Sequence, residues 1–323
     1  MKKSIINIRF LAIVLVVLGH SIILYSNDWS IYKTSYNLPI LDLLKYLINI
    51  FSMPLFFSIS GYLFQLSKKT KAMSFIKKKA KRLIVPYICI SIIWLIPIRL
   101  LVKYPGYENK KITEIFVNGI LMGNDNGHLW YLPTLFLCFI IIYFLKNKFN
   151  NKKIISYVIF LSSSLIYIFP ISIFKISYLN FTLQYYCWFY LGYLIFSYEK
   201  KLQKVPLIKL LLLTLLFTIL TIIFRYNILL INNFFKYISG ICWVLLIYKL
   251  VSKIKTNKII EYVSCNSFGI YLFHSPLVYI TFSKMANYNP KIIIFINFVI
   301  FGGLALLLTN VIRILKVKFI IGE

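Results

Sequence analysis

Apolar residues dominate ten stretches of the chain, separated by shorter polar segments rich in lysine. Each stretch is close to the roughly 20 residues that an α-helix needs to cross a bilayer, so the pattern predicts ten transmembrane helices. They cover residues 8–25, 39–66, 83–102, 129–145, 154–173, 181–198, 206–226, 233–250, 265–282 and 292–315. Segment 112–122 is short and amphipathic, and we expect it to lie at the membrane surface without crossing.

Composition places the chain among the membrane proteins. Of its 323 residues, 60% are hydrophobic and 14% are charged, a balance that excludes a soluble globular fold. The sequence contains neither an internal repeat nor a linker, so we expect an all-α fold with a single membrane domain over residues 1–323. Arg9 interrupts the first apolar run, which is therefore expected to be an uncleaved span and not a secretory signal.

The net charge of +29 has a topological explanation. Cytoplasmic loops of membrane proteins carry an excess of Lys and Arg, and most of these residues fall here in alternate polar segments. The basic segments are 2–9, 68–82, 146–153, 200–209, 249–258 and 313–318. We therefore predict that both termini are cytoplasmic and that the protein lies in a cell membrane, of the bacterial cytoplasmic kind. A nucleic-acid partner is not expected, because the charge forms no single basic domain.

Few residue types are left to carry chemistry. The chain has no phosphate-binding loop, no dinucleotide fingerprint and no zinc-protease motif, and its eight acidic residues argue against a transporter built on buried carboxylates. Asp42 is the main acidic residue near a predicted span. It is a candidate to bind or deprotonate a polar substrate, and the alternative is that it caps the helix at the membrane interface. The cysteines are scattered without paired spacing, and neither a disulfide framework nor a metal site is expected. They are Cys89, Cys138, Cys187, Cys242 and Cys265.

Arg9 and His20 are the most informative pair. They are eleven positions apart, which in an α-helix is about three turns with roughly 20° of offset, so both project from one face. A helix that starts in the cytoplasm would place Arg9 at the inner boundary and His20 near mid-bilayer. Ionisable groups inside a membrane usually mark a pathway or a reaction centre. The alternative is that His20 only forms a hydrogen bond to a neighbouring helix. Arg9 would then be one of the cytoplasmic basic residues that fix the topology.

The chain has only three histidines, and none lies in a predicted cytoplasmic loop. His20 lies in the first helix, His128 at the outer mouth of the fourth, and His274 about midway along the ninth. Histidine is the natural general base near neutral pH, and a neutral imidazole can take a proton from a sugar hydroxyl that attacks an acyl group. The alternatives are a boundary-solvating role for His128 and helix–helix hydrogen bonding for His274.

The segment between residues 67 and 82 is expected to be a cytoplasmic loop, and it has the highest density of positive charge. Attraction to anionic lipid headgroups is the plain explanation, and binding of a phosphate-rich donor such as coenzyme A is the second. Its basic residues are Lys68, Lys69, Lys71, Lys77, Lys78, Lys79, Lys81 and Arg82.

Five blocks resemble the acyltransferase-3 family of integral-membrane acyltransferases, particularly the members that O-acetylate surface sugars. Arg9 and His20 match its R-x10-H signature, and residues 53–62 look like its P-x-F-F-x-x-S-G-[FY] block. Residues 78–86 are similar to its basic segment, 128–133 to its H-x-W-[FY]-L block, and 267–274 to its S-x-x-x-Y-x-x-H stretch. Many relatives have an acidic residue shortly before the arginine, where this chain has Asn7.

The resemblance implies an enzyme that transfers an acyl group to a hydroxyl of a surface or lipid-linked carbohydrate. The donor would be cytoplasmic acetyl-CoA or another acyl-CoA. His20 and Arg9 would be catalytic, and the donor would bind at Lys78, Lys79, Lys81 and Arg82. Candidate substrate-binding residues are Asp42, Ser60, His128, Trp130 and His274. Transfer can be direct or pass through an acyl-histidine or acyl-serine.

Two other classes of protein remain open at this point. A flippase or transporter for lipid-linked sugars would also use basic and aromatic residues in a helical bundle, although ten helices is few for such a protein. A purely structural membrane protein gives no reason for the buried Arg9–His20 pair.

Overall fold

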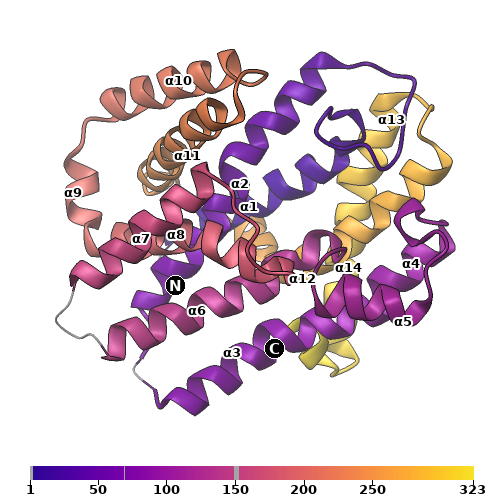
Figure 1. The fold of residues 1–323 in the computed structure, drawn as a ribbon, viewed down its shortest axis with the longest axis horizontal. Helices are drawn as coiled ribbons and strands as arrows, with labels where there is room; N and C mark the ends of the chain where they lie inside the picture. The colour runs from indigo at the N-terminus through magenta and orange to yellow at the C-terminus, as the bar shows by residue number, and fades with distance from the viewer. Residues whose placement is uncertain (1–2, 69, 149–152) are drawn as a thin grey trace. The chain divides into compact units, whose positions relative to one another are not determined.

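The computed structural model describes residues 3–68, 70–148 and 153–323, and none of these forms a β-strand (Figure 1). Each of the ten apolar stretches contains a helix, which confirms the prediction of an all-α fold. Lys2, Lys69 and Lys152, which belong to the predicted basic segments, lie outside the described residues.

Along the chain, the helices are joined by turns and by loops such as residues 26–38. Helices α1 to α5 are Lys3–Ser21, Pro39–Gln65, Ala72–Ile90, Ile96–Leu101 and Ile112–Glu114. Helices α6 to α10 are Tyr131–Lys148, Lys153–Ile168, Ser177–Ser197, Glu199–Lys204 and Leu207–Ile223. Helices α11 to α14 are Leu229–Val251, Lys258–Lys284, Pro290–Phe295 and Phe301–Ile314. The 3-10 and π segments η1 to η7 are Ile23–Tyr25, Ser91–Leu95, Pro105–Tyr107, Ile115–Leu121, Gly127–Trp130, Ile296–Ile300 and Lys318–Ile321.

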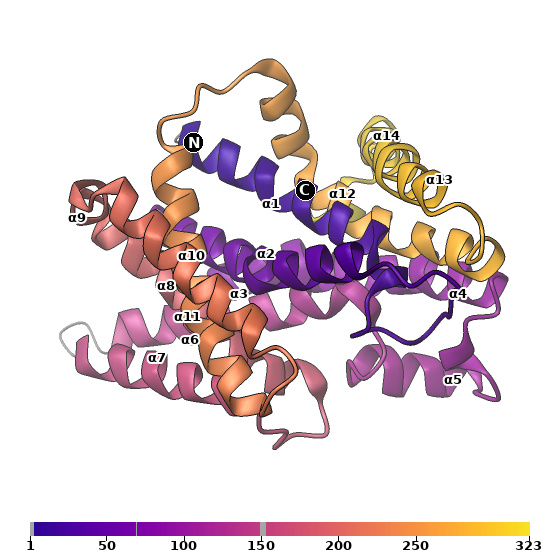
Figure 2. The same ribbon diagram turned by 90° about the horizontal axis from the view of Figure 1, so that it is seen from above.

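Among the described residues, six helices are long and apolar enough to cross a membrane. Three of them join shorter elements: α3, η2 and α4 form one helix of 30 residues, α13, η6 and α14 form one of 25, and η5 continues into α6 (Figure 2). The six are Lys3–Ser21, Pro39–Gln65, Ala72–Leu101, Gly127–Lys146, Leu229–Val251 and Pro290–Ile314. A multi-pass membrane protein is thus established, whereas ten crossings and cytoplasmic termini remain predictions.

The basic segment is not the loop that the sequence predicts, because α3 already begins at Ala72. Phe75 and Leu83 are buried, while Lys78, Lys81 and Arg82 are exposed. Apolar and charged residues therefore occupy different faces of residues 72–82. This amphipathic segment extends the helix on the N-terminal side of the apolar stretch. The predicted donor-binding residues stand on a helix that leads directly into the third apolar stretch.

The chain folds into two compact units, each built from separate segments. Unit 1 holds residues 1–12, 50–72 and 134–260, and unit 2 holds residues 13–49, 73–133 and 261–323. In unit 1, α10 packs along α11 and α7 along α8 (Figures 1 and 2). Whether these units act as one membrane domain remains a prediction.

Helix α12 buries most of its side chains, polar ones included, and nearly all of it belongs to unit 2. Trp94 Nε1 donates to the carbonyl of Phe273 at 3.1 Å, and Thr281 donates to Asn297 Oδ1 at 2.7 Å. Gly269 touches α14 so closely that a Cβ built on it would lie 2.1 Å from Thr309 Oγ1. The polar residues of α12 thus serve contacts inside the protein, which explains its lower hydropathy.

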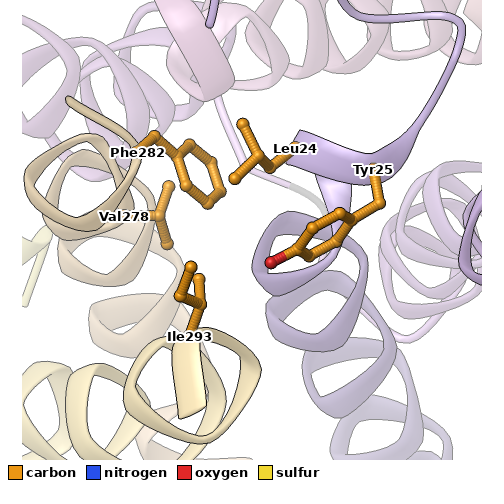
Figure 3. Close-up of a cluster of buried hydrophobic side chains, with 5 residues drawn as sticks. All are labelled: Leu24, Tyr25, Val278, Phe282 and Ile293. Atoms are coloured by element: carbon orange, nitrogen blue, oxygen red, sulfur yellow. The ribbon is translucent and has the colours of Figure 1, made fainter. Parts of the chain in front are cut away.

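An apolar cluster fastens η1 to α12 and α13 within unit 2. Figure 3 shows its five buried members, which are Leu24, Tyr25, Val278, Phe282 and Ile293. Leu24 follows His20 by four residues, and Val278 follows His274 by four. The cluster therefore joins α12, which carries His274, to η1, the segment that directly follows the helix of His20.

Candidate active site

The three histidines of the chain converge in unit 2. His20 comes from the last turn of α1, His128 from η5 and His274 from the middle of α12. His20 Nδ1 lies 2.8 Å from His274 Nε2. The ring centroid of His128 lies 6.3 Å from that of His20 and 5.7 Å from that of His274. The sequence predicts only that each histidine lies away from the cytoplasmic loops, and the structure brings them into one cluster.

Hydrogen-bond chemistry sets the tautomers of the neutral His20–His274 pair. His274, only 1% exposed, has Nδ1 at 2.8 Å from the carbonyl oxygen of Ile270. A carbonyl oxygen only accepts, so Nδ1 carries the proton and Nε2 is the acceptor. His20 Nδ1 must then be the donor to His274, which leaves the lone pair of His20 on Nε2. Nε2 of His20 is therefore the basic nitrogen that a general base requires.

His128 presents a second unprotonated nitrogen. Its Nε2 lies 3.2 Å from the carbonyl oxygen of Leu272 and so acts as the donor. Its Nδ1 is buried and has no hydrogen-bond partner. Within the described ranges, no group of three or more His, Cys, Asp or Glu side chains is arranged to hold a metal ion. The cluster therefore offers two imidazole lone pairs to a polar substrate.

The backbone around His128 is fixed from two sides. The hydroxyl of Tyr271, on α12, donates a short hydrogen bond to the carbonyl of His128. Asn126 Nδ2 donates to the hydroxyl of Tyr87 at 3.1 Å, and that hydroxyl donates to the carbonyl of Ile120 at 2.5 Å. These bonds hold the turn before α6 against α3 and α12, which positions the imidazole of His128.

Arg99 is the largest polar group that supports this turn. It is 1% exposed, and one terminal nitrogen donates to Asp125 Oδ1 at 2.8 Å and to the Asp125 carbonyl at 3.1 Å. The other donates to the hydroxyl of Tyr279 at 2.9 Å. Because Tyr279 belongs to α12, Arg99 ties the segment that precedes His128 to the helix that carries His274.

Aromatic rings surround the Arg99 guanidinium, whose Cζ lies 4.2 Å from the ring centroid of Tyr104 and 5.0 Å from that of Tyr279. Burial raises the pKa of Tyr104 and of Tyr107, although Arg99 acts in the opposite direction. Both phenols are thus protonated at neutral pH. Their ring faces favour the cation, and the Asp125 carboxylate supplies the balancing charge.

Lys45 is a buried cation at the same end of α1. It lies on α2, is 7% exposed, and donates from Nζ to Asn49 Oδ1 at 2.8 Å. A Cβ built on Gly19 would lie 3.4 Å from Nζ, so the ammonium stands against the last turn of α1, next to His20. The partial negative charge at this helix end favours a cation there.

Asp42 and Trp130 are the other substrate-binding candidates in unit 2. The Asp42 carboxylate accepts from the backbone N–H of Asn27 at 2.9 Å and from its side-chain amide at 3.3 Å. This contact fits the interfacial-cap alternative, because it fastens the loop after α1 to the first turn of α2. Trp130 is half-buried and ends η5, two residues after His128.

Arg9 and Ser60 belong to unit 1, on segments of α1 and α2. Arg9 is half-buried and shares the continuous helix α1 with His20. Ser60 donates from Oγ to the carbonyl of Phe56 at 3.1 Å. Its neighbour Gly61 packs so tightly that a Cβ built there would lie 1.8 Å from the carbonyl oxygen of Phe189. At Gly61, α2 therefore packs closely against the backbone of α8.

The predicted donor-binding residues share one helical segment in unit 2. Lys78, Lys81 and Arg82 are exposed, whereas Lys79 is half-buried and has Nζ 5.5 Å from the ring centroid of Phe75. The chain's C-terminal turn packs below them, since a Cβ on Gly322 would lie 2.5 Å from the Arg82 carbonyl oxygen. Three exposed cations thus remain accessible to an anionic group.

The fold and the site together define an all-helical, multi-pass membrane protein that contains a cluster of three histidines. A sequence model for a family described as an acyltransferase domain matches residues 2–313. The match covers nearly the whole chain, so the protein belongs to this acyltransferase family, as its motifs indicated. It is an acyltransferase that transfers acyl groups other than amino-acyl groups. Neither a curated protein nor a solved structure matches the chain.

Proposed function

We propose that this membrane acyltransferase O-acetylates a carbohydrate, with acetyl-CoA as donor and a surface or lipid-linked glycan as acceptor. The observation that carries the proposal is the His20–His274 contact, which leaves a lone pair on His20 Nε2. Transfer to a hydroxyl requires a base of this kind, since an alcohol is a weak nucleophile until its proton is removed.

In the proposed reaction, His20 Nε2 accepts the hydroxyl proton as the sugar oxygen attacks the thioester carbonyl. The tetrahedral intermediate then collapses, the C–S bond breaks, and the imidazolium returns the proton to the coenzyme A thiolate. The products are an O-acyl ester and the free thiol. The bond from His20 Nδ1 to His274 Nε2 stabilises the charged imidazolium, much as a carboxylate does in a hydrolase triad.

The donor is proposed to bind by its phosphates to the basic segment of α3, at Lys78, Lys79, Lys81 and Arg82. Exposed cations attract a polyanionic nucleotide over several ångströms even without tight pairing. Arg9, on the N-terminal part of α1, is proposed to be catalytic together with His20. This arrangement requires the cytoplasmic orientation that the distribution of lysines predicts.

Deletion of the gene tests the proposal. NMR of the surface glycans should lose O-acetyl signals in the deletion strain, and wild-type protein should restore them whereas the His20→Ala variant should not. Unchanged acyl groups would overturn the proposal. Loss of the glycan itself from the cell surface would instead favour the flippase alternative.

A further inference from the structure

Pro276 interrupts the backbone hydrogen bonding of α12 next to the histidine cluster. The helix runs from Lys258 to Lys284 and contains this proline two residues after His274. In an α-helix the N–H of each residue donates to the carbonyl four residues earlier, and proline has no N–H. The carbonyl of Leu272 therefore lacks its usual donor within the helix.

An imidazole takes the place of the missing backbone donor. His128 Nε2 donates to the Leu272 carbonyl at 3.2 Å. Leu272 is 0% exposed and His128 only 7%, so bulk water does not serve either group. Buried carbonyls are almost always paired. The missing N–H of Pro276 and the ring N–H of His128 thus complement each other.

The turn of α12 before Pro276 has two further contacts with other elements. Trp94 Nε1, on η2, donates to the carbonyl of Phe273 at 3.1 Å. In the other direction, the hydroxyl of Tyr271 donates to the carbonyl of His128. Residues 271 and 272 therefore hold both the backbone and the ring of His128, which fixes the imidazole at two points.

A second buried proline inside a helix shows a different use of the freed carbonyl. In α2, Pro54 leaves the carbonyl of Ile50 without its usual donor. This carbonyl lies against the backbone of α11, since a Cβ built on Gly240 would lie 3.0 Å from its oxygen. Pro54 thus serves close helix packing, whereas Pro276 opens an acceptor for a side chain of the candidate site.

We infer that Pro276 is a positioning residue of the acyltransferase, because it leaves the Leu272 carbonyl free to hold His128 with its lone pair on Nδ1. That nitrogen is buried without a hydrogen-bond partner, and an unprotonated imidazole nitrogen accepts from a hydroxyl. A hydroxyl of the acceptor is the group that it would bind. This last step rests on the proposed function, whereas the effect of Pro276 on the tautomer does not.

NMR of purified, detergent-solubilised protein labelled with ¹⁵N-histidine tests the inference, because the chain has only three histidines. In wild-type protein the His128 signals, identified by their loss in His128→Gln, should report a protonated Nε2 and an unprotonated Nδ1. Pro276→Ala restores a backbone N–H that competes for the Leu272 carbonyl, so His128 should lose this single tautomer. Pro54→Ala is the matched control and should leave the His128 signals unchanged.

Acylation of unacylated glycan from the deletion strain provides the functional readout. Pro276→Ala should raise KM for the glycan about tenfold, the loss of one hydrogen bond, and leave KM for acetyl-CoA unchanged. In a His128→Ala background the same substitution should have no further effect, because Pro276 acts through His128. The unfolding temperature should not fall, since alanine is a far better helix former than proline.

The outcomes separate this inference from the proposed function. An unchanged His128 tautomer in folded Pro276→Ala protein overturns the inference, as does an equal rise in KM in the His128→Ala background. If wild-type protein does not acylate the glycan, the proposed function fails, and the NMR signals alone decide the role of Pro276. Should Pro276→Ala not fold, Pro276→Val restores the same N–H and retains the bulk of the ring.

Discussion

His20 and His274, 254 residues apart in the sequence, share a hydrogen bond of 2.8 Å between Nδ1 and Nε2. The Ile270 carbonyl fixes the proton on the far side of His274. The direction of this chain of bonds makes His20 the base and His274 the residue that positions it.

Replacing His274 should therefore impair turnover without abolishing binding of the donor. We expect His274→Ala to lower kcat about 10²-fold, because His20 loses the acceptor that fixes its tautomer. His274→Gln should recover part of the loss, since an amide oxygen can accept from His20 Nδ1. Initial rates at saturating acyl-CoA provide the measurement, with Cys265→Ala, an exposed position on the same helix, as control. Equal activity of all three variants would contradict the positioning role.

The ion pair between buried Arg99 and partly exposed Asp125 should be important for stability. Removing the carboxylate leaves the guanidinium charge of Arg99 buried without its balancing charge, which is the costly way to break an ion pair. Asp125→Asn should lower the unfolding temperature in detergent strongly, and Arg99→Lys should do so as well, since an ammonium cannot reproduce the planar contacts of a guanidinium. Lys284→Gln, at an exposed position, should leave it unchanged. An unaltered unfolding temperature in Asp125→Asn would disprove the role of the pair.

Two tyrosine hydroxyls should respond in opposite ways to removal. The Tyr25 hydroxyl is buried without a hydrogen-bond partner in the apolar cluster of Figure 3, so Tyr25→Phe should leave stability unchanged or raise it slightly. Tyr271→Phe should lower it by about 1 kcal/mol or more, because the carbonyl of His128 loses its donor. Thermal unfolding of the two variants under identical detergent conditions compares them directly. A larger loss in Tyr25→Phe than in Tyr271→Phe would contradict the assignment.

Glycines at helix contacts should differ sharply in their tolerance of a methyl group. A Cβ on Gly61 would lie 1.8 Å from a backbone oxygen, whereas one on Gly303 meets nothing within 4 Å. Gly61→Ala should therefore reduce the yield of folded protein, since α2 and α8 must separate to admit it. Gly303→Ala should fold normally, because alanine is the better helix former by roughly 0.5–1 kcal/mol. Size-exclusion profiles of the two variants test this, and a normal Gly61→Ala profile would refute it.

Hydropathy predicts the helices well, because a segment that crosses a bilayer must be apolar over about 20 residues. Its main error falls at residues 72–82, where a run of lysines hides a helix whose Phe75 and Leu83 face inward. In this segment the charged residues are as numerous as the apolar ones, which lowers the mean hydropathy, and only the helical spacing reveals the buried face. α12 shows the converse, since its buried polar side chains lower the hydropathy of a helix that is mostly buried.

The individual histidines are evident from the sequence, but their contacts are not. His20, His128 and His274 come from three distant segments, and no local spacing relates them. Arg99 resembles an ordinary basic residue at the end of a span, yet it is almost fully buried. The signal that would have pointed to it is Asp125, one of only eight acidic residues, within a polar turn three residues before His128.

The central claim is that His20 is the general base of an acyl transfer, and turnover by purified His20→Ala protein tests it most directly. Acetyl-CoA-dependent acylation of glycan from the deletion strain should fall by about 10²–10⁴-fold, while the variant keeps the elution profile and thermal stability of the wild type. Arg9→Ala should also be severe, and Arg9→Lys only partly active if a planar contact is needed. Near-normal turnover by a folded His20→Ala variant would contradict the account.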